Sequence, residues 1–239
     1  MIIKLISTTM KNDIFWNFNN LKEYIKNEKE ADILVFGEAY LQGFNSLTWN
    51  YEKDKYIAIS IYDREIVEIR EICNKYKVGV SFGFYEIFEG YIYSSNIVID
   101  KNGEILNIYR RVSKTWKLTG DNRYKEGDDF HTFTFMNKKI LPIICGDLWF
   151  NKYIKRINSI DKDFIFWPLY IDYSISEWES SGLRDYIDQS SKINVPILMV
   201  NSYSIDEYGA IGGAYEFYKG EIKNKIDLGS LGELKIELI

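Results

Sequence analysis

Apolar residues recur along the chain in two alternating patterns, short apolar runs and longer stretches with helical spacing. The runs 2–7 and 31–36 predict buried strands, because a strand that is covered on both faces keeps few polar positions. Between them, Asp13 is a suitable N-cap for a helix over about 14–29, whose apolar positions recur three or four residues apart. A second helix is predicted over 54–76.

The rest of the chain repeats this alternation. The strands predicted after residue 77 lie at 78–86, 91–100, 104–111, 130–135, 140–145, 164–168, 195–201, 212–218, 220–226 and 233–239. Helices are predicted from the end of the 140–145 run through about 158, and again over 176–193. Strands that alternate with helices in both halves predict one α/β domain, 1–239, with layered mixed sheets, since no linker or repeat divides the chain.

Composition narrows the class of protein. The chain has 239 residues, 46% of them apolar, which is enough for a sizeable core. Its net charge is −5 and its 30 basic residues are scattered, so we expect neither a nucleic-acid nor an anionic-membrane partner. No apolar stretch reaches the length of a membrane helix, and the first residues lack the apolar run of a signal peptide. We therefore expect a cytoplasmic protein with reduced thiols.

The few cysteines and the single histidine restrict the chemistry. Cys73 and Cys145 are too few for a disulfide scaffold, and no zinc site with several histidines or four cysteines can form. A Ser-His-Asp triad would have to use His131. That residue shares a predicted strand face with Phe133 and Phe135, so we interpret it as structural.

Three kinds of reactive group follow predicted strands. Glu38 comes after the 31–36 run, several cations lie at 110–117, and Cys145 ends the 140–145 run. Ligands bind at the carboxyl ends of strands in open α/β sheets. A thiol needs a base before it attacks a carbonyl carbon, and the resulting oxyanion needs a cation or N–H donors. A carboxylate, a cation and a thiol at strand ends therefore predict a site for acyl transfer.

These residues resemble the motifs of the carbon–nitrogen hydrolase (nitrilase-like) superfamily, which uses a Glu-Lys-Cys triad. The resemblance runs in order over about residues 2–218. Its motifs here are Phe36-Gly37-Glu38 ending at Gly43-Phe44, Asn96, Asp100-Lys101-Asn102-Gly103, Tyr109-Arg110-Arg111, Ile144-Cys145-Gly146-Asp147, the run 164–168, Trp178-Glu179 and Asn201.

The resemblance implies a four-layer α-β-β-α sandwich with two mixed sheets, assembled as a homodimer or larger oligomer. It also implies a thiol hydrolase that cleaves a non-peptide C–N bond of a small-molecule amide. Glu38 would act as the base and Cys145 as the nucleophile, while a lysine and the Gly146 N–H would stabilise the oxyanion. Water would then hydrolyse the thioester, and no metal or organic cofactor is needed.

The chain departs from the family pattern at the lysine. Arg111 occupies the aligned position, and Lys114 and Lys117 follow it. An arginine fork is larger and orients its donors differently from a compact ammonium. Because Trp116 can anchor the turn and hold Lys117 inward, we rank Lys117 first as the catalytic cation. Lys114 ranks second, with a substrate contact as its other role, and Arg111 ranks third.

Other roles stay open. The family's second glutamate has no clear match, and Asp121, Glu126 and Glu86 are candidates. Asp147 is either a helix N-cap or a substrate contact, since both suit a carboxylate after Cys145. Trp167 lies near a strand end and is a candidate for the wall of the substrate pocket.

The rival hypothesis is a non-catalytic small-molecule-binding protein on the same scaffold, which the displacement of the lysine from its family position favours. Thiol reactivity discriminates the two, because a catalytic Cys145 should be alkylated much faster than Cys73. Within the catalytic hypothesis we expect an amide substrate rather than a nitrile. True nitrilases of the superfamily tend to have Trp-Glu after the cysteine, where this chain has Gly146-Asp147.

Overall fold

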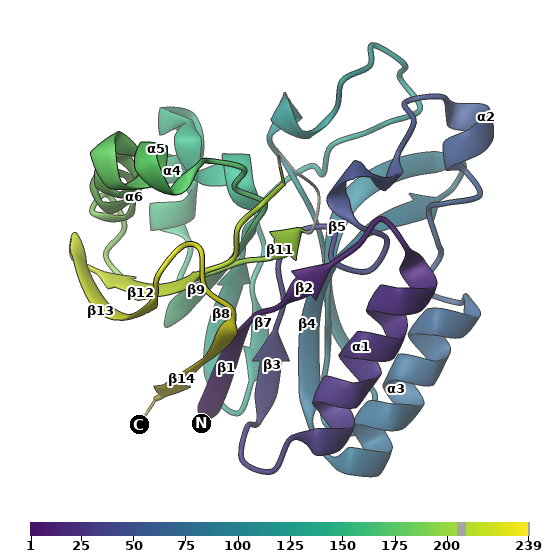
Figure 1. Ribbon diagram of the computed structural model, residues 1–239, viewed down its shortest axis with the longest axis horizontal. Coiled ribbons are helices and arrows are strands. Elements are labelled where there is room, and N and C mark those ends of the chain that lie inside the picture. Colours follow the sequence, from purple (N-terminus) through teal and green to yellow (C-terminus); the bar gives the residue numbers. More distant parts are fainter. Residues whose placement is uncertain (205–208, 239) are drawn as a thin grey trace.

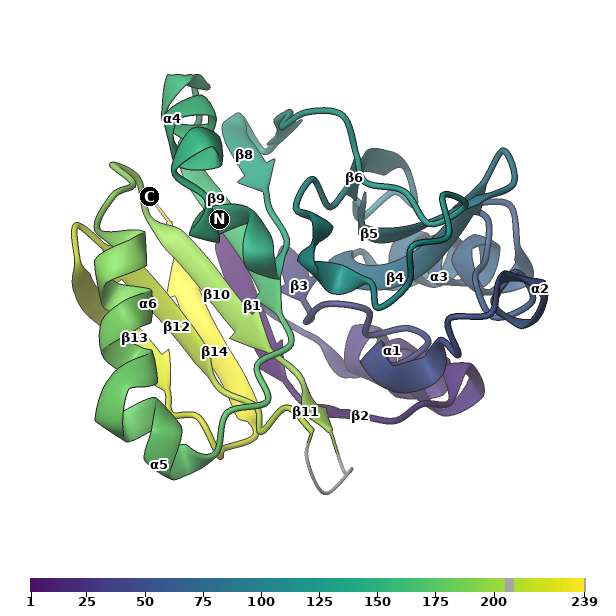
Figure 2. The same cartoon turned by 90° about the horizontal axis from the view of Figure 1, so that it is seen from above.

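The structure is a computed structural model that describes residues 1–204 and 209–238. Two six-stranded mixed sheets pack against each other, and helices cover their outer faces (Figures 1 and 2). The fold is therefore the expected α-β-β-α sandwich. The core between the sheets contains Ile3, Leu5 and Val35 from the first sheet, packed against Phe166 and Val200 of the second.

The first sheet has the strand order β14-β1-β3-β4-β5-β6. Its strands are β1 (Ile2–Ser7), β3 (Ile33–Val35), β4 (Gly79–Phe88), β5 (Tyr91–Ile99), β6 (Ile105–Arg110) and β14 (Gly232–Glu237). β1, β3 and β4 are parallel neighbours, whereas β14 pairs antiparallel with β1. The last strand of the chain thus returns to the sheet that holds the first.

The second sheet has the order β13-β12-β10-β9-β8-β7. Its strands are β7 (Phe133–Phe135), β8 (Lys138–Pro142), β9 (Phe164–Leu169), β10 (Ile197–Asn201), β12 (Ala214–Tyr218) and β13 (Glu221–Ile226). A small parallel pair, β2 (Thr9–Met10) and β11 (Tyr203–Ser204), joins segments that extend from β1 and β10.

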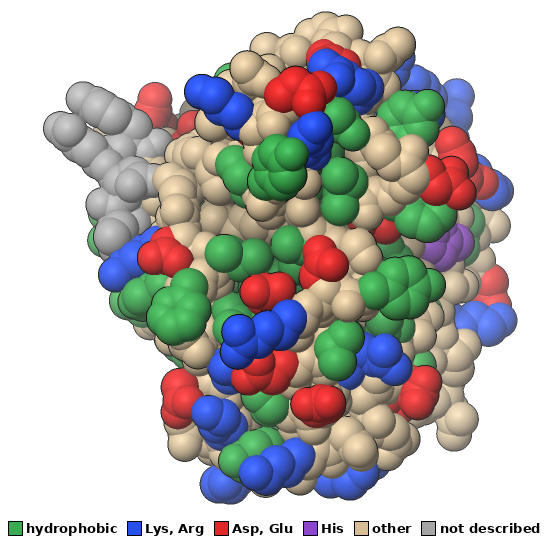
Figure 3. All heavy atoms as spheres, turned by 90° about the vertical axis from the view of Figure 1, so that its right-hand side faces the viewer, with side chains coloured by type: hydrophobic (Ala, Val, Ile, Leu, Met, Phe, Trp, Pro, Cys, Tyr) green, Lys and Arg blue, Asp and Glu red, His purple; other side chains and the backbone are tan. Residues whose placement is uncertain are grey.

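Helices α1 (Ile14–Asn27) and α3 (Arg64–Tyr76) pack side by side on the first sheet (Figure 1). The N-cap prediction is confirmed, because the Asp13 side chain accepts a hydrogen bond from the N–H of Trp16 at 3.0 Å. On the face that Figure 3 shows, cationic and anionic side chains intermingle without a large patch of either sign. Within the described residues, no helix has both the length and the apolarity needed to cross a membrane.

The helix predicted over 54–76 is too long. α2 (Tyr51–Asp54) ends where that helix was expected to begin, and residues 55–63 lie outside any helix. Local polar contacts compete with helix formation here, since the Asp63 carboxylate accepts a hydrogen bond from the N–H of Ser60 at 2.9 Å. Ile59 instead forms a parallel β-bridge with Glu86, which lies in β4.

The second sheet is covered by α4 (Asn151–Ser159) and α6 (Leu183–Ser190). The helix expected over 176–193 is interrupted: α5 (Ile175–Glu177) leads into a π-helical turn, η4 (Trp178–Gly182), before α6. The helix expected directly after Cys145 is also broken. It begins as a short 3₁₀ turn, η3 (Cys145–Trp149), and α4 follows.

Candidate active site

Three chain segments from the ends of strands in both sheets converge on one buried site. Glu38 lies three residues beyond β3, Arg111 directly follows β6, and Cys145 lies three residues beyond β8 at the start of η3. Strands β3 and β6 run in the same direction in the first sheet, so their carboxyl ends lie on the same edge. The structure places both Glu38 and Cys145 shortly after the carboxyl end of a strand, where the sequence pattern predicts them.

Glu38 and Arg111 form a buried ion pair. Arg111 Nη1 donates to Glu38 Oε1 at 2.7 Å, and the two side chains are only 3% and 1% exposed. The Ser94 hydroxyl donates to the same oxygen at 3.3 Å. Charges that are buried this deeply need a partner of opposite sign, and Glu38 and Arg111 are partners for each other. The second oxygen, Glu38 Oε2, is buried and accepts no hydrogen bond from a nitrogen or oxygen donor among the described residues.

The Cys145 backbone takes a left-handed conformation, with φ of +39°. Its carbonyl oxygen accepts a hydrogen bond from Trp167 Nε1 at 3.0 Å, and Trp167 itself is fully buried. Trp167 was expected to line a substrate pocket, but its indole N–H instead holds the peptide of Cys145. A left-handed non-glycine residue is strained, so this contact helps to fix the turn that presents the thiol.

The electrostatic setting keeps the thiol protonated at neutral pH. The pKa of Cys145 is raised to about 12, and burial among protein atoms is the largest cause. The Glu38 charge also raises this pKa, by more than the Arg111 charge lowers it. Cys145 as a residue is partly exposed, although its thiol is surrounded by protein atoms. A thiol in this state needs a base at the moment of attack, and Glu38 is the carboxylate beside it.

The Arg111 guanidinium is fixed on three sides. Besides Glu38, its Nε donates to the Ser113 hydroxyl at 2.8 Å and its Nη2 donates to the Thr115 hydroxyl at 2.7 Å. Burial opposes the charge, but Glu38 and neighbouring acids raise the pKa of Arg111, so it stays cationic. Nη2 also lies against Gly146, where an added Cβ would come within 2.4 Å of it. The cation is thus next to the turn that carries the thiol.

Asp147 joins the cysteine segment to the arginine segment. The carboxylate is fully buried and accepts four hydrogen bonds, all from protein donors. The donors are Ile144 N at 2.9 Å, Val112 N at 3.1 Å, Ser113 N at 2.7 Å and Tyr109 Oη at 2.6 Å. The bond from Ile144 N is a local cap at the start of η3, whereas the other three bonds tie Asp147 to the end of β6 and to the loop that follows it.

Among the described residues, neither of the two candidate lysines pairs with Glu38. Lys117 Nζ pairs with Glu126 Oε1 at 2.7 Å and donates to the Tyr124 carbonyl oxygen at 2.7 Å. Trp116 is buried and anchors the turn as expected, but Lys117 then points toward Glu126. Lys114 is exposed at the start of the 3₁₀ turn η2 (Lys114–Trp116). Among the three ranked cations, Arg111 is the one that contacts Glu38, although it was placed last.

The candidates for a second glutamate all pair with cations of their own. Arg110 binds Glu86 through two hydrogen bonds of 2.7 Å, and Arg123 binds Asp121 at 2.7 Å. Glu126 binds Lys117. Within the described chain, no group of three or more His, Cys, Asp or Glu side chains is arranged to hold a metal ion.

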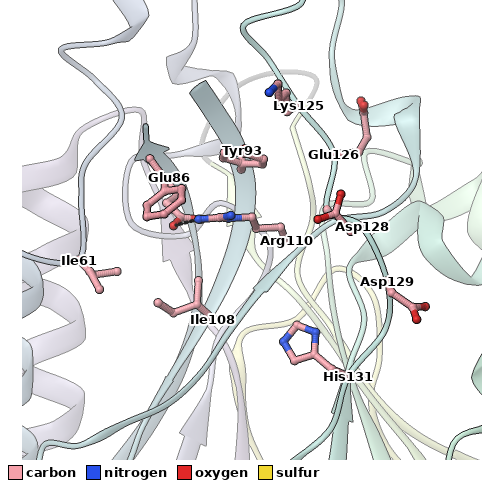
Figure 4. Close-up of a pocket in the computed structure, with 12 residues that line it drawn as sticks. Ile61, Glu86, Tyr93, Ile108, Arg110, Lys125, Glu126, Asp128, Asp129 and His131 are labelled. Carbon is pink, nitrogen blue, oxygen red and sulfur yellow. Dashed lines mark hydrogen bonds and ion pairs between the residues drawn. The ribbon is translucent and has the colours of Figure 1, made fainter. Parts of the chain in front are cut away.

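A cavity of about 570 Å³ is lined by residues of β4, β5 and β6 and of the segment 125–131 (Figure 4). Its lining includes Glu86 and Arg110, and the Arg110 guanidinium stacks over the Tyr93 ring at 4.2 Å. His131 also lines this cavity and hydrogen-bonds to Asn107 at 2.8 Å. Neither Glu38 nor Cys145 belongs to the lining, so this cavity is a separate feature of the surface.

Sequence reasoning missed the polar residues that support the site. Ser94, Tyr109, Ser113 and Thr115 hold Glu38, Asp147 or Arg111 in place. One signal was available: hydroxyl residues stand two and four positions after Arg111, and a glycine follows Cys145. That combination suits a guanidinium, which offers several donors in one plane.

The fold and the site together define an α-β-β-α sandwich protein with a buried glutamate, a cation and a cysteine at strand ends. The sequence profile described as carbon-nitrogen hydrolase matches residues 6–182. The chain therefore belongs to the carbon–nitrogen hydrolase family, which confirms the resemblance seen in its motifs.

Individual relatives are more distant. A nitrilase from Meyerozyma guilliermondii is 30% identical over an alignment of 152 residues, and the match covers 54% of this chain and 47% of that protein. The match thus spans about half of the length of this curated relative.

Solved structures show the same fold at low identity. An amidase of the nitrilase superfamily from Nesterenkonia matches with a TM-score of 0.74 and 13% identity, over 100% of this chain and 90% of that one. A glutamine-dependent NAD⁺ synthetase from Acinetobacter baumannii matches with a TM-score of 0.80 and 16% identity, over 98% of this chain and 44% of that one. A carbon–nitrogen hydrolase from Helicobacter pylori G27 matches with a TM-score of 0.74 and 14% identity, over 98% of this chain and 88% of that one.

Proposed function

We propose that this carbon–nitrogen hydrolase cleaves the C–N bond of a small non-peptide amide through a Cys145 thioester. Glu38 is the general base, Cys145 the nucleophile and Arg111 the cation of the site. The observation that supports this most is the buried Glu38–Arg111 ion pair beside the Cys145 turn. A base and a fixed cation next to a thiol are what attack on a carbonyl carbon requires.

In the first half-reaction, Glu38 accepts the thiol proton while the Cys145 sulfur bonds to the amide carbon. The proton transfer accompanies the attack, because a thiol with a pKa of about 12 is ionised in roughly one molecule in ten thousand at pH 8. Arg111 and the Gly146 N–H then stabilise the oxyanion. The C–N bond breaks as Glu38 returns the proton to nitrogen, and ammonia or an amine leaves.

In the second half-reaction, water replaces the amine. Glu38 takes a proton from water, hydroxide adds to the thioester carbon, and the C–S bond breaks. The proton on Glu38 returns to the sulfur, which restores the thiol and releases a carboxylic acid. Water is the only co-reactant, and no cofactor takes part in these steps.

Two structures of the Nesterenkonia amidase support amides as the compounds to test. In one, acrylamide is added to the active-site cysteine of that protein, and in the other the acetamide moiety of fluoroacetamide is bound there. Both reagents are small and carry a primary amide. The homo-oligomer and the cytoplasmic location that the sequence analysis expects stay predictions.

Matched amide and nitrile pairs test the proposed reaction. We expect ammonia release from the amides to be faster, because Gly146-Asp147 stands where true nitrilases tend to have Trp-Glu. Colorimetric ammonia measurement gives the rates, and intact-mass spectrometry under acid quench should detect an acyl adduct on Cys145. Faster release from the nitriles would overturn the choice of substrate class. Absence of ammonia and of adducts with both sets would instead favour the non-catalytic binding protein.

The pH dependence of thiol alkylation tests the electrostatics. Because the pKa of Cys145 is raised to about 12, alkylation by iodoacetamide should rise about tenfold per pH unit from 7 to 10. Cys73 is fully buried, so it should stay unmodified while the protein is folded, and a Cys73→Ala variant gives the clean profile. In Glu38→Gln the profile should move to lower pH, since the Glu38 charge raises this pKa. A plateau near pH 9 in the wild type would contradict the prediction.

A further inference from the structure

Every nitrogen of Arg111 already has a protein acceptor of its own. Nη1 is bonded to Glu38, Nε to the Ser113 hydroxyl and Nη2 to the Thr115 hydroxyl, all within 2.8 Å. The three acceptors surround the planar group, so both its position and the rotation of its plane are fixed. Two N–H groups, one on each terminal nitrogen, remain for a ligand.

Gly146 completes the enclosure from the cysteine side. A Cβ at this position would lie 2.4 Å from Arg111 Nη2, 2.6 Å from the Thr115 hydroxyl and 2.9 Å from the Ser113 hydroxyl. A side chain at 146 would therefore have to displace the Arg111 guanidinium or the two hydroxyl groups. The guanidinium therefore lies directly against the peptide that follows the nucleophile.

We propose that Ser113, Thr115 and Gly146 form a guanidinium cradle, which makes arginine the working cation where the family has lysine. The inference rests on the proposed function, because it explains how an arginine serves the oxyanion. Ser113 and Thr115 are positioning residues, which act through Arg111.

A lysine cannot replace the arginine within this cradle. Its single nitrogen can remain with Glu38, but it cannot reach both hydroxyls in the directions that the Nε and Nη2 atoms occupy. Without the arginine, the Ser113 hydroxyl would lose the hydrogen bond that it accepts from Arg111 Nε. Because Ser113 is fully buried, water cannot easily supply a replacement donor. The family's own cation is thus disfavoured at this position of this chain.

The first test is a double-mutant cycle between positions 111 and 115. Thr115 is exposed, so Thr115→Val should fold normally. We expect it to lower kcat about tenfold with little change in KM, and Arg111→Lys to lower kcat about a hundredfold. In the double variant, Thr115→Val should add no further loss, because the lysine does not use that hydroxyl. Thr134→Val, at an exposed site on β7, is the matched control and should leave kcat unchanged.

The second test uses guanidinium itself as the probe. In Arg111→Ala, guanidinium chloride at 5–50 mM, roughly the range in which a weak cation site fills, should raise the melting temperature and restore part of kcat. Methylammonium chloride at equal concentration should do neither. Adding Ser113→Ala and Thr115→Val to Arg111→Ala should abolish the guanidinium effect, since the acceptors are then gone.

The two readouts separate this inference from the proposed function. Guanidinium could raise the melting temperature of Arg111→Ala selectively while neither this variant nor the wild type turns over an amide. That result would support the cradle and count against the hydrolase. Full activity in Arg111→Lys, or additive losses in the cycle, would overturn the cradle while the hydrolase stands. If Arg111→Ala does not fold, the cycle alone decides, because Arg111→Lys keeps the ion pair with Glu38.

Discussion

Replacing Cys145 with alanine is expected to abolish amide turnover and to leave the folded structure intact. The sulfur is the atom that bonds to the substrate carbon, so the variant loses the covalent route and turnover should fall by roughly 10⁴-fold or more. The fold should persist because alanine is smaller, and the strained turn at φ of +39° is no worse for alanine than for cysteine. Circular dichroism and a melting curve check the fold, and ammonia release checks turnover.

Cys73→Ala is the matched control for this experiment. Cys73 lies on α3 within the helix-to-sheet core, and its side chain is fully buried. Its replacement should cost about 1 kcal/mol of stability through lost packing, with turnover preserved. Wild-type turnover in Cys145→Ala would refute the assignment of the nucleophile. An equal loss in both variants would show that the effect is structural.

Glu38 and Cys145 could be predicted from the sequence because each follows a buried apolar run. Such runs are strands in a layered α/β fold, and their ends meet at the same edge of the sandwich. The strands of the two six-stranded sheets follow from the same pattern, whereas the short strands β2 and β11 were not predicted. What the pattern does not contain is the pairing between distant strands, such as the return of β14 to β1 in the first sheet.

The choice among Arg111, Lys114 and Lys117 could not be made from the same pattern. All three lie in a polar loop, where the direction of each side chain depends on hydrogen bonds to residues elsewhere. Lys117 is drawn to Glu126, while Arg111 is held by Glu38 and by hydroxyls within its own loop. Alignment to the family pattern points to Arg111, the cation that pairs with Glu38, whereas the preference for a compact ammonium pointed to Lys117.

Asp147 shows a second kind of limit. A carboxylate two residues after a nucleophile suits an N-cap, a substrate contact or a structural bond equally well in sequence. The structure shows that two of its donors, Val112 and Ser113, come from the loop after β6, which is about 35 residues away along the chain. This long-range contact brings the segments that carry the cysteine and the arginine together.

Asp147→Asn is therefore expected to reduce both stability and acylation strongly. The carboxylate accepts from three N–H groups and one hydroxyl, but an asparagine amide has one accepting oxygen and one donating NH₂. Wherever the NH₂ points, it faces the Ile144 N–H or the pair from Val112 and Ser113, and a donor cannot accept from a donor. We expect a loss of about 2–4 kcal/mol in the free energy of unfolding, because buried N–H groups are left unsatisfied.

The effect on chemistry should exceed the effect on folding. Ile144 precedes the nucleophile directly, and Ser113 both donates to Asp147 and accepts from Arg111, so the lost bonds release the thiol and the cation from each other. We expect acylation per folded molecule to fall at least about a hundredfold, since small displacements of reacting groups cost that much.

Tyr109→Phe is the graded control, because it removes only the 2.6 Å bond from the Tyr109 hydroxyl and leaves the three N–H bonds in place. It should cost about 1–2 kcal/mol of stability and little of the acylation rate. Urea unfolding measures the stability. Acid-quenched time points analysed by intact-mass spectrometry measure the acylation rate. If Asp147→Asn loses stability but acylates like Tyr109→Phe, Asp147 supports the fold without positioning the site. If it matches the wild type in both, the carboxylate does not join the two loops at all.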